Sequence, residues 1–314
     1  MPDGKLPVAL VTGFLGSGKT TLISSLLGHP AMGETAVIVN ELGEVGIDHH
    51  LLRRVDERTV LLDSGCLCCS LRDDLATELR DLLGRRDRGE IPAFRRVVVE
   101  TTGLADPGPI VYTLLSEPVV RHHYRLETVV ATVDAQHGLR EPESVRQAAA
   151  ADTLVVTKTD VVPAVSLAGR LAELNPAARV LEVSFGEVDP ELLLRGGDHD
   201  LPEVAVEPHD HDGVAALSLV LDEALDWTAF GIWLTMLLQA RGQDILRVKG
   251  LLDVGGPQPV LLNGVQHVVH PPLHLDAWPD DDHRTRIVFI GRGLDRAALT
   301  ESLRAFSRAA TCPP

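Results

Sequence analysis

Cysteine is scarce in this chain. Only four of its 314 residues are cysteines, too few for a disulfide framework in a chain of this length. Three of the four, Cys66, Cys68 and Cys69, stand close together, and two cysteines separated by one residue rarely reach good disulfide geometry. We therefore expect this cluster to be reduced and available for metal binding or redox chemistry.

Long hydrophobic runs are also missing. No apolar run approaches the roughly 20 residues that a transmembrane helix requires, and the N-terminus MPDGKLPVALVTG lacks a basic region followed by a long apolar stretch and a cleavage site. We expect no membrane span and a cytoplasmic location. Hydrophobic residues still make up 45% of the chain and charged residues 24%, which indicates a globular protein with a core rather than a disordered one.

Basic residues are outnumbered by acidic ones. The chain has 29 Lys and Arg against 45 Asp and Glu, a formal net charge of −16. This charge repels a phosphate backbone and offers no general basic patch. We expect no nucleic acid partner.

Short apolar segments alternate with helical patterns over residues 6–195. Strands this apolar are buried on both faces, and their alternation with helices predicts βαβ units around a mostly parallel sheet. In such α/β sheets, ligands gather at the carboxyl ends of the strands. The predicted strands are 6–12, 36–40, 60–62, 96–100, 128–133, 153–157 and 179–183, and helical patterns include 19–27, 71–83 and 165–174.

The composition changes at residue 196, where GGDHDLPEVAVEPHDHDG has little apolar content and no helical period. Such a segment is typical of an exposed linker, so we divide the chain into domains of residues 1–196 and 214–314, with a linker of residues 197–213. The second domain is predicted to be a smaller α+β layer, one sheet with helices on one face. Its predicted strands are 214–221, 245–254, 259–269 and 285–290, and its predicted helices are 227–240 and 294–307.

The segment GFLGSGKT at residues 13–20 fits the phosphate-binding pattern GxxxxGK[ST]. Glycines let backbone N–H groups surround a phosphate, the helix N-terminus adds its positive dipole end, the lysine adds a charge, and the Thr20 hydroxyl can bind Mg²⁺. A strand before the motif and a helix after it favour this function over a plain glycine-rich turn. The predicted nucleotide-binding residues here are Gly13, Gly16, Ser17, Gly18, Lys19, Thr20 and Thr21.

An acidic residue ends another apolar strand in RRVVVETTG. Glu100 can hold Mg²⁺ or its water, and Gly103 can offer its N–H to a γ-phosphate. Glu100 could instead be a solvated charge at a strand end. Together with Lys19, these two residues form the predicted catalytic set.

The segment TLVVTKTD ends a third strand. Asp160 can accept hydrogen bonds from the N1–H and the amino group of guanine, and the stem of Lys158 can lie over the base. Taken alone, the segment could be a plain turn. Its position after the other two motifs favours guanine binding by Thr157, Lys158 and Asp160.

These motifs, with GCLCC between the first and the second, resemble the CobW-type metallochaperone GTPases, relatives of the urease and hydrogenase nickel-insertion GTPases. The resemblance covers nearly the whole chain. It rests on GFLGSGKTTL, VNELGEVGID, SGCLCCSLRDDL, VVVETTGLADP and VVTKTD in the first domain, and on DILRVKGLL, GVQHVVHPP and RIVFIGRGLD in the second.

The resemblance implies a GTP-binding domain, a CxCC metal site and a C-terminal domain for client contact. It therefore implies GTPase activity, with GTP and Mg²⁺ at one site and Zn²⁺ or Co²⁺, or Ni²⁺ as a further candidate, at the other. The expected partner is a metal-requiring client protein, with a metal-dependent homodimer as a second candidate. One departure concerns the guanine motif, which usually begins with asparagine and begins here with Thr157.

The cysteine cluster suits transition metals, because thiolate sulfur binds Zn²⁺, Co²⁺ and similar ions. The helix predicted to start near Ser70 would lower the thiol pKa and favour the metal-binding form. No second CxxC or HxxxH pair lies nearby, which predicts an incomplete shell that exchanges its metal. Inert buried cysteines and a redox pair are the alternatives. Glu41 and Glu44 of NELGE are candidate further ligands, or surface acids.

Histidines fall in two groups. His199, His209 and His211 lie among aspartates in the linker, a composition that either binds metal loosely or is only solvated. For the second group, in GVQHVVHPPLH, we favour structural histidines over a surface metal or partner site; this group comprises His267, His270 and His274.

The mechanism predicted from these motifs couples two sites through loops. GTP and Mg²⁺ would order the NELGE and ETTGLADP loops and close the thiolates around a metal, and hydrolysis would loosen them. No water-orienting glutamine or arginine finger is evident from spacing, so we expect slow intrinsic turnover. A P-loop kinase of a small metabolite and a non-enzymatic metal buffer are the alternative functions.

Overall fold

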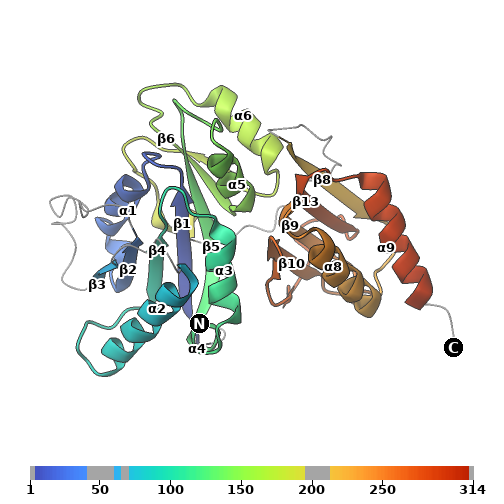
Figure 1. Cartoon of the computed structure of the whole chain (residues 1–314), viewed down its shortest axis with the longest axis horizontal. Coiled ribbons are helices and arrows are strands. Elements are labelled where there is room, and N and C mark those ends of the chain that lie inside the picture. Colours follow the sequence, from blue (N-terminus) through green and yellow to red (C-terminus); the bar gives the residue numbers. More distant parts are fainter. Residues whose placement is uncertain (1–3, 41–59, 65–70, 195–212, 311–314) are drawn as a thin grey trace. The chain divides into compact units, whose positions relative to one another are not determined.

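The computed structural model describes residues 4–40, 60–64, 71–194 and 213–310 (Figure 1). The chain divides into two compact units. The first holds residues 1–170 and 178–197, and the second holds residues 171–177 and 198–314.

The first unit contains a parallel sheet with the strand order β3-β2-β4-β1-β5-β6-β7, and each neighbouring pair is parallel. This arrangement confirms the predicted α/β class. Its strands are β1 (Leu6–Gly13), β2 (Thr35–Asn40), β3 (Val60–Ser64), β4 (Arg96–Glu100), β5 (Tyr124–Asp134), β6 (Thr153–Thr157) and β7 (Arg179–Glu182).

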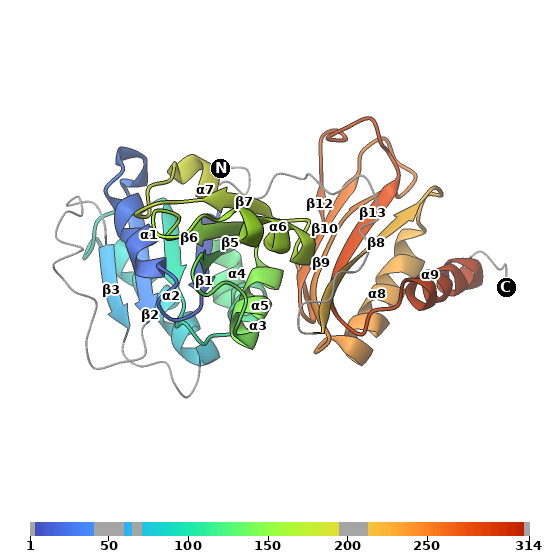
Figure 2. The same cartoon turned by 90° about the horizontal axis from the view of Figure 1, so that it is seen from above.

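Helices cover both faces of this sheet (Figure 2). In β1, Val8 and Leu10 point to one face and Ala9 and Val11 to the other, and all four are buried. Such two-sided burial is why the strands are apolar at successive positions. The helices are α1 (Lys19–Leu27), α2 (Leu71–Asp87), α3 (Pro107–Ser116), α4 (Pro118–His123), α5 (Pro142–Ala150), α6 (Val165–Leu174) and α7 (Pro190–Leu194), with a 3₁₀ turn η1 (Pro30–Met32).

The register of the central strands collects the predicted motifs at one edge of the sheet. Strand β1 lies between β4 and β5, with Val11 opposite Glu100 and Gly13 opposite Thr132. Strand β6 follows β5 and ends at Thr157. Because all these strands are parallel, the phosphate motif, the acidic strand end and TKTD follow their carboxyl ends at the same edge.

The second unit contains an antiparallel sheet with the strand order β11-β10-β9-β13-β8, and β12 pairs with β10. This sheet and two long helices confirm the smaller α+β part. The elements are β8 (Val214–Leu221), α8 (Trp227–Arg241), β9 (Ile245–Leu252), β10 (Val260–Val265), β11 (Val268–Val269), β12 (Leu273–His274), β13 (Thr285–Arg292) and α9 (Arg296–Ala310).

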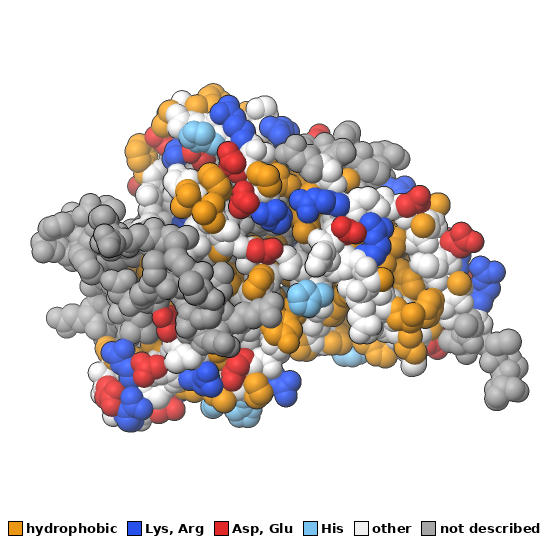
Figure 3. Space-filling view, viewed as in Figure 1, with side chains coloured by type: hydrophobic (Ala, Val, Ile, Leu, Met, Phe, Trp, Pro, Cys, Tyr) orange, Lys and Arg blue, Asp and Glu red, His pale blue; other side chains and the backbone are white. Residues whose placement is uncertain are grey.

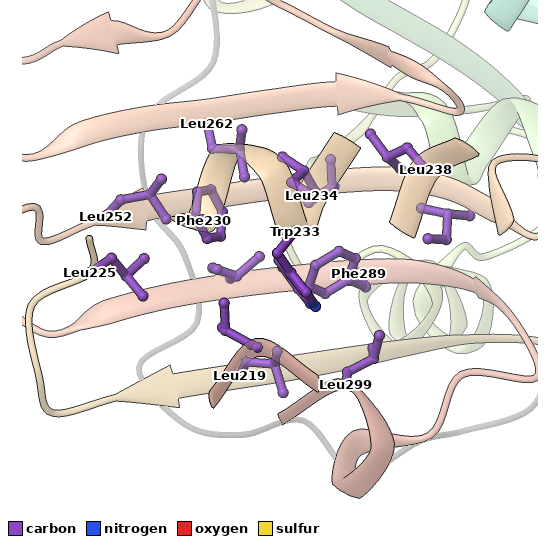
Figure 4. Close-up of a cluster of buried hydrophobic side chains, with 14 of the residues drawn as sticks. Leu219, Leu225, Phe230, Trp233, Leu234, Leu238, Leu252, Leu262, Phe289 and Leu299 are labelled. Carbon is purple, nitrogen blue, oxygen red and sulfur yellow. The ribbon is translucent and has the colours of Figure 1, made fainter. Parts of the chain in front are cut away.

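Helices α8 and α9 pack on one face of this sheet around Trp233 (Figure 4). The Trp233 ring lies edge-on to Phe289 of β13, with 6.2 Å between ring centroids, and its Nε1–H donates to Ser302 Oγ at 2.9 Å. The aromatic ring therefore joins both helices to the sheet. The strand predicted at residues 259–269 is two strands, because a turn with Gln266 at a φ of 53° separates β10 from β11.

The described surface carries charges of both signs. Figure 3 shows Lys and Arg side chains interspersed with Asp and Glu side chains on one face. No helix in the described ranges combines the length and apolar character needed to cross a membrane.

Candidate functional site

A cavity of about 310 Å³ lies at the carboxyl edge of the first sheet. The phosphate motif forms one side of it and the loop after β4 forms the other. The lining residues are Leu15, Gly16, Gly18, Lys19, Thr20, Thr21, Thr101, Thr102 and Gly103. Two motifs that are about 80 residues apart in the sequence thus enclose one space, as the parallel topology requires.

The backbone of the phosphate motif depends on glycine. Gly13 has a φ of 143°, and a Cβ there would lie 2.2 Å from Thr132 Oγ1. Gly16 and Gly18 also have positive φ values, of 71° and 93°, which other residues adopt only with strain. The sequence pattern therefore reflects a loop that bends sharply into the start of α1 while it packs against β5.

Lys19 is buried at the base of this loop, with 8% of its surface exposed. Its ammonium donates to the carbonyl oxygens of Gly13 at 2.8 Å and Phe14 at 3.1 Å. These bonds hold the charge inside the curve of the loop, where a phosphate group would replace them as the partner.

Thr20 lines the cavity and contacts an acidic side chain that lies buried behind it. The Thr20 hydroxyl donates to Glu100 Oε1 at 2.7 Å, and the Glu100 side chain is fully buried. Burying a carboxylate is costly unless a cation or donors compensate its charge. A hydroxyl and a carboxylate at this distance, next to a phosphate loop, are the oxygen ligands that suit Mg²⁺.

The loop after β4 presses its backbone against the phosphate motif. Thr101 N–H donates to Val11 O at 2.9 Å, and a Cβ added at Gly103 would lie 2.6 Å from the backbone N of Leu15. Only glycine can lie this close to the Leu15 backbone, and the Gly103 backbone therefore lines the cavity. The contact of Gly103 with a γ-phosphate stays a prediction.

Thr157, at the end of β6, bonds to the phosphate motif directly. Its hydroxyl donates to Ser17 O at 2.6 Å. Its buried side chain lies on the side of Gly18 where a Cβ would project, 3.5 Å from that position. The threonine that stands where the resembled family usually has asparagine thus ties the TKTD segment to the phosphate loop through a buried hydrogen bond.

We expect Thr157→Val to weaken the binding of guanine nucleotides by about 5-fold to 30-fold, since a buried carbonyl left without its donor costs roughly 1 to 2 kcal/mol. Isothermal titration with GDP measures this loss. The control is Thr153→Val, the same change at the buried start of the same strand. Equal affinities for the wild type and Thr157→Val would contradict the role of this bond.

Lys158 is anchored by an aspartate from the neighbouring strand. Asp134 Oδ2, at the end of β5, accepts from Lys158 Nζ at 2.5 Å and lies 2.9 Å from His137 Nδ1. This contact fixes the Lys158 ammonium, and the contact of its alkyl stem with a base stays a prediction. Asp160 in the same turn is exposed, so its carboxylate is accessible to a ligand.

The contacts around Asp134 keep it ionised. Burial alone would raise the pKa of its carboxyl group, but hydrogen bonds from Lys158, His137 and the Gln136 backbone N–H outweigh this effect and lower the pKa. The stability from these bonds is therefore present above the pKa of an unfolded aspartate and is lost as the pH falls through the lower folded value. The Lys158 anchor persists at neutral pH.

Both parts of the chain match known families. Residues 7–182 match the CobW/HypB/UreG nucleotide-binding domain, and residues 214–307 match the cobalamin synthesis protein CobW C-terminal domain. The chain belongs to the CobW/HypB/UreG family. This confirms the resemblance inferred from the motifs.

Two curated relatives are similar over nearly their whole length. The zinc chaperone YjiA of Escherichia coli is 36% identical, covering 91% of this chain and 94% of the relative. The zinc chaperone CobW of Pseudomonas aeruginosa is 33% identical over 96% and 91%. The crystal structure of the Zn(II)-bound YjiA GTPase aligns with a TM-score of 0.72 and 31% identity over 96% of this chain and 99% of that one.

The predicted metal site of this CobW-family chain lies outside the described residues. This applies to Cys66, Cys68, Cys69, Glu41 and Glu44, and to the linker histidines. Within the described ranges, no group of three or more His, Cys, Asp or Glu side chains could hold a metal ion. His267 and His274 are exposed and His270 is partly buried, and their structural role stays a prediction.

Sequence reasoning missed three residues of the nucleotide edge. The sequence contains a feature that points to Asp134, because this acidic residue, like Glu100, ends an apolar strand. No sequence feature points to Thr132, since threonine is common inside strands. None points to Gln147 of α5 either, and its contacts reach 42 and 44 positions back along the chain.

Proposed function

We propose that this protein is a GTP-dependent metal chaperone that carries zinc and couples GTP hydrolysis to transfer of the ion to a client protein. The observation that carries the proposal is the cavity in which Lys19 and Thr20 face the loop of Gly103, with the Thr20 hydroxyl bonded to the buried Glu100 carboxylate. A phosphate site of this kind, in a CobW-family chain with a GCLCC motif, supports nucleotide-controlled metal binding.

The nucleotide would occupy the edge of the first sheet. The glycine-rich loop and Lys19 would bind the β- and γ-phosphates, and Asp160 and Lys158 would bind guanine. Mg²⁺ fits the Thr20 hydroxyl and the Glu100 carboxylate, and when bound it would neutralise phosphate charge. Gly103 would donate its N–H to the γ-phosphate. We propose GTPase activity, which the name of the YjiA GTPase supports. We expect its intrinsic turnover to be slow, because no water-orienting glutamine or arginine finger is evident in the sequence.

The metal cargo would bind to Cys66, Cys68 and Cys69, with Glu41 as a further ligand. Strand β3 ends at Ser64, at the same edge of the sheet as the phosphate motif, and the cysteines follow directly in sequence. Zinc is favoured because two relatives are named zinc chaperones. Cobalt and nickel remain candidates, since thiolate ligands accept both.

Coupling between the two sites must be reciprocal. If GTP tightens zinc binding by some factor, zinc must tighten GTP binding by the same factor. We further propose that residues 1–196 form the GTPase domain and that residues 214–314, after a linker of residues 197–213, contact the metal-requiring client. The relatives' description as chaperones supports a client protein.

The Cys66→Ser, Cys68→Ser, Cys69→Ser triple variant tests this proposal. In equilibrium dialysis with Zn²⁺, we expect the wild type to retain more zinc with a non-hydrolysable GTP analogue than with GDP. The triple variant should lose this nucleotide-dependent fraction, because its hydroxyl groups bind zinc far more weakly than thiolates do. Any zinc that the triple variant still retains equally in all nucleotide states is bound at another site.

The matched control is Cys312→Ser, which removes the one cysteine outside the cluster and should leave the nucleotide-dependent fraction intact. The proposal fails if the wild type retains the same amount of zinc with no nucleotide, with GDP and with the GTP analogue. Product analysis separates the kinase alternative, which would yield a phosphorylated metabolite in place of inorganic phosphate.

A further inference from the structure

Gln147 is a buried amide that contacts the loop after β4 from behind. It lies on α5, and only 1% of its surface is exposed. Its Nε2 donates to Gly103 O at 3.1 Å and to Ala105 O at 3.0 Å. Because both partners are carbonyl acceptors, the amide must present its NH₂ group to them, which fixes its orientation.

The loop held by Gln147 is the one that faces the phosphate motif. Thr101, Thr102 and Gly103 line the cavity, and Ala105 N–H closes a turn by donating to Thr102 O at 3.0 Å. Gly103 thus has the phosphate motif on one side and the Gln147 amide on the other. These contacts hold the loop from both sides.

The Gln147 NH₂ group sets the orientation of two peptide groups, those that follow Gly103 and Ala105. In a trans peptide the C=O and the following N–H point in opposite directions. Fixing Gly103 O toward Gln147 therefore turns the Leu104 N–H away from α5, and fixing Ala105 O does the same for the Asp106 N–H. Without the amide, both carbonyls would be buried with no donor, and the loop would have to rotate to satisfy them.

We propose that Gln147 is a positioning residue that holds the loop of residues 101–106 in the conformation that accepts the γ-phosphate. This inference rests on the proposed GTPase function. The β-phosphate would be held by the glycine-rich loop and Lys19, which Gln147 does not touch. The γ-phosphate alone would contact the loop that Gln147 holds. Gln147 therefore controls the preference for GTP over GDP rather than nucleotide affinity in general.

The test is Gln147→Leu, which keeps a similar size and removes both donated hydrogen bonds. Titration calorimetry with Mg²⁺ gives the dissociation constants for GDP and for a non-hydrolysable GTP analogue. We expect affinity for the analogue to fall about 10-fold or more while affinity for GDP stays within about 3-fold. A role confined to folding would lower the two affinities together.

Ser144→Ala is the matched control. Ser144 is buried on the same helix and its hydroxyl donates to Gly138 O at 3.1 Å, so the variant removes one buried bond from α5 without touching the loop. It should leave the ratio of the two affinities unchanged. If Gln147→Leu does not fold, Gln147→Asn serves instead, because it keeps the amide but shortens its reach by one methylene.

The outcomes separate the inference from the proposed function. A Gln147 variant that loses affinity for GDP and the analogue equally, or for neither, overturns the positioning role while the wild type still binds both. A wild type that binds neither nucleotide overturns the proposed function itself. A selective loss for the analogue in the Gln147 variant, with an unchanged ratio in Ser144→Ala, supports the inference.

Discussion

Replacing Lys19 by methionine should lower GTP hydrolysis by about 100-fold to 1,000-fold, the loss that follows removal of one preorganised charged donor from a phosphate site. Lys19 is buried at the centre of the glycine-rich loop and bonds to the Gly13 and Phe14 carbonyls. No other described Lys or Arg lines the cavity. Methionine matches the length of the lysine stem but carries no charge. Phosphate release measured under single-turnover conditions gives the rate.

Lys5→Met is the control for this experiment, because it makes the same change just before β1, whereas Lys19 follows the other end of that strand. Its hydrolysis rate should stay close to that of the wild type. Hydrolysis by Lys19→Met at more than about a tenth of the wild-type rate would mean that the phosphates bind elsewhere, since a lost charged hydrogen bond costs at least that factor.

Replacing Glu100 by glutamine should produce the second large loss, about 100-fold in the hydrolysis rate at a fixed Mg²⁺ concentration. The carboxylate is fully buried and accepts from the Thr20 hydroxyl. Glutamine has nearly the same shape but no negative charge to hold a divalent cation. The Mg²⁺ concentration that gives half-maximal hydrolysis should therefore rise together with the loss in rate.

A Mg²⁺ titration of hydrolysis in Glu100→Gln and in Glu182→Gln tests this expectation. Glu182 also ends a strand of the parallel sheet, β7, but it is exposed, so its replacement should change neither the rate nor the Mg²⁺ dependence. If the Mg²⁺ dependence of Glu100→Gln matches that of the wild type, Glu100 does not bind the cation and acts as a structural acid.

The two experiments address different parts of the predicted nucleotide site. Lys19 tests whether phosphate binds in the glycine-rich loop, and Glu100 tests whether a cation joins it there. Neither depends on the cysteine motif, so the hydrolytic site can be established before metal binding is measured. A hydrolytic site that works normally in the cysteine triple variant, with no change on adding Zn²⁺, would separate GTP turnover from metal transfer.

The fold class and the principal chemistry can be predicted from the amino-acid sequence alone. Strands that are apolar at successive positions must be buried on both faces, and their alternation with helices leaves few topologies besides a parallel sheet. The segment GFLGSGKT largely specifies its own local structure. Its glycines allow positive φ values, and the residues directly after them form a helix, so the loop depends on residues that are close in sequence. Glu100 and Thr157 can be predicted because each ends a buried strand, and Gly103 because it lies three residues after Glu100.

The contacts between these motifs, in contrast, depend on the packing of the whole domain. That Thr157 reaches Ser17 across 140 positions, that Asp134 anchors Lys158 and that Gln147 holds Gly103 depend on strand order and register. These contacts form between segments whose local sequences carry no information about one another. The conformational preferences of neighbouring residues determine each strand and turn. Which side chains contact one another in the core is determined by the packing of the whole sheet.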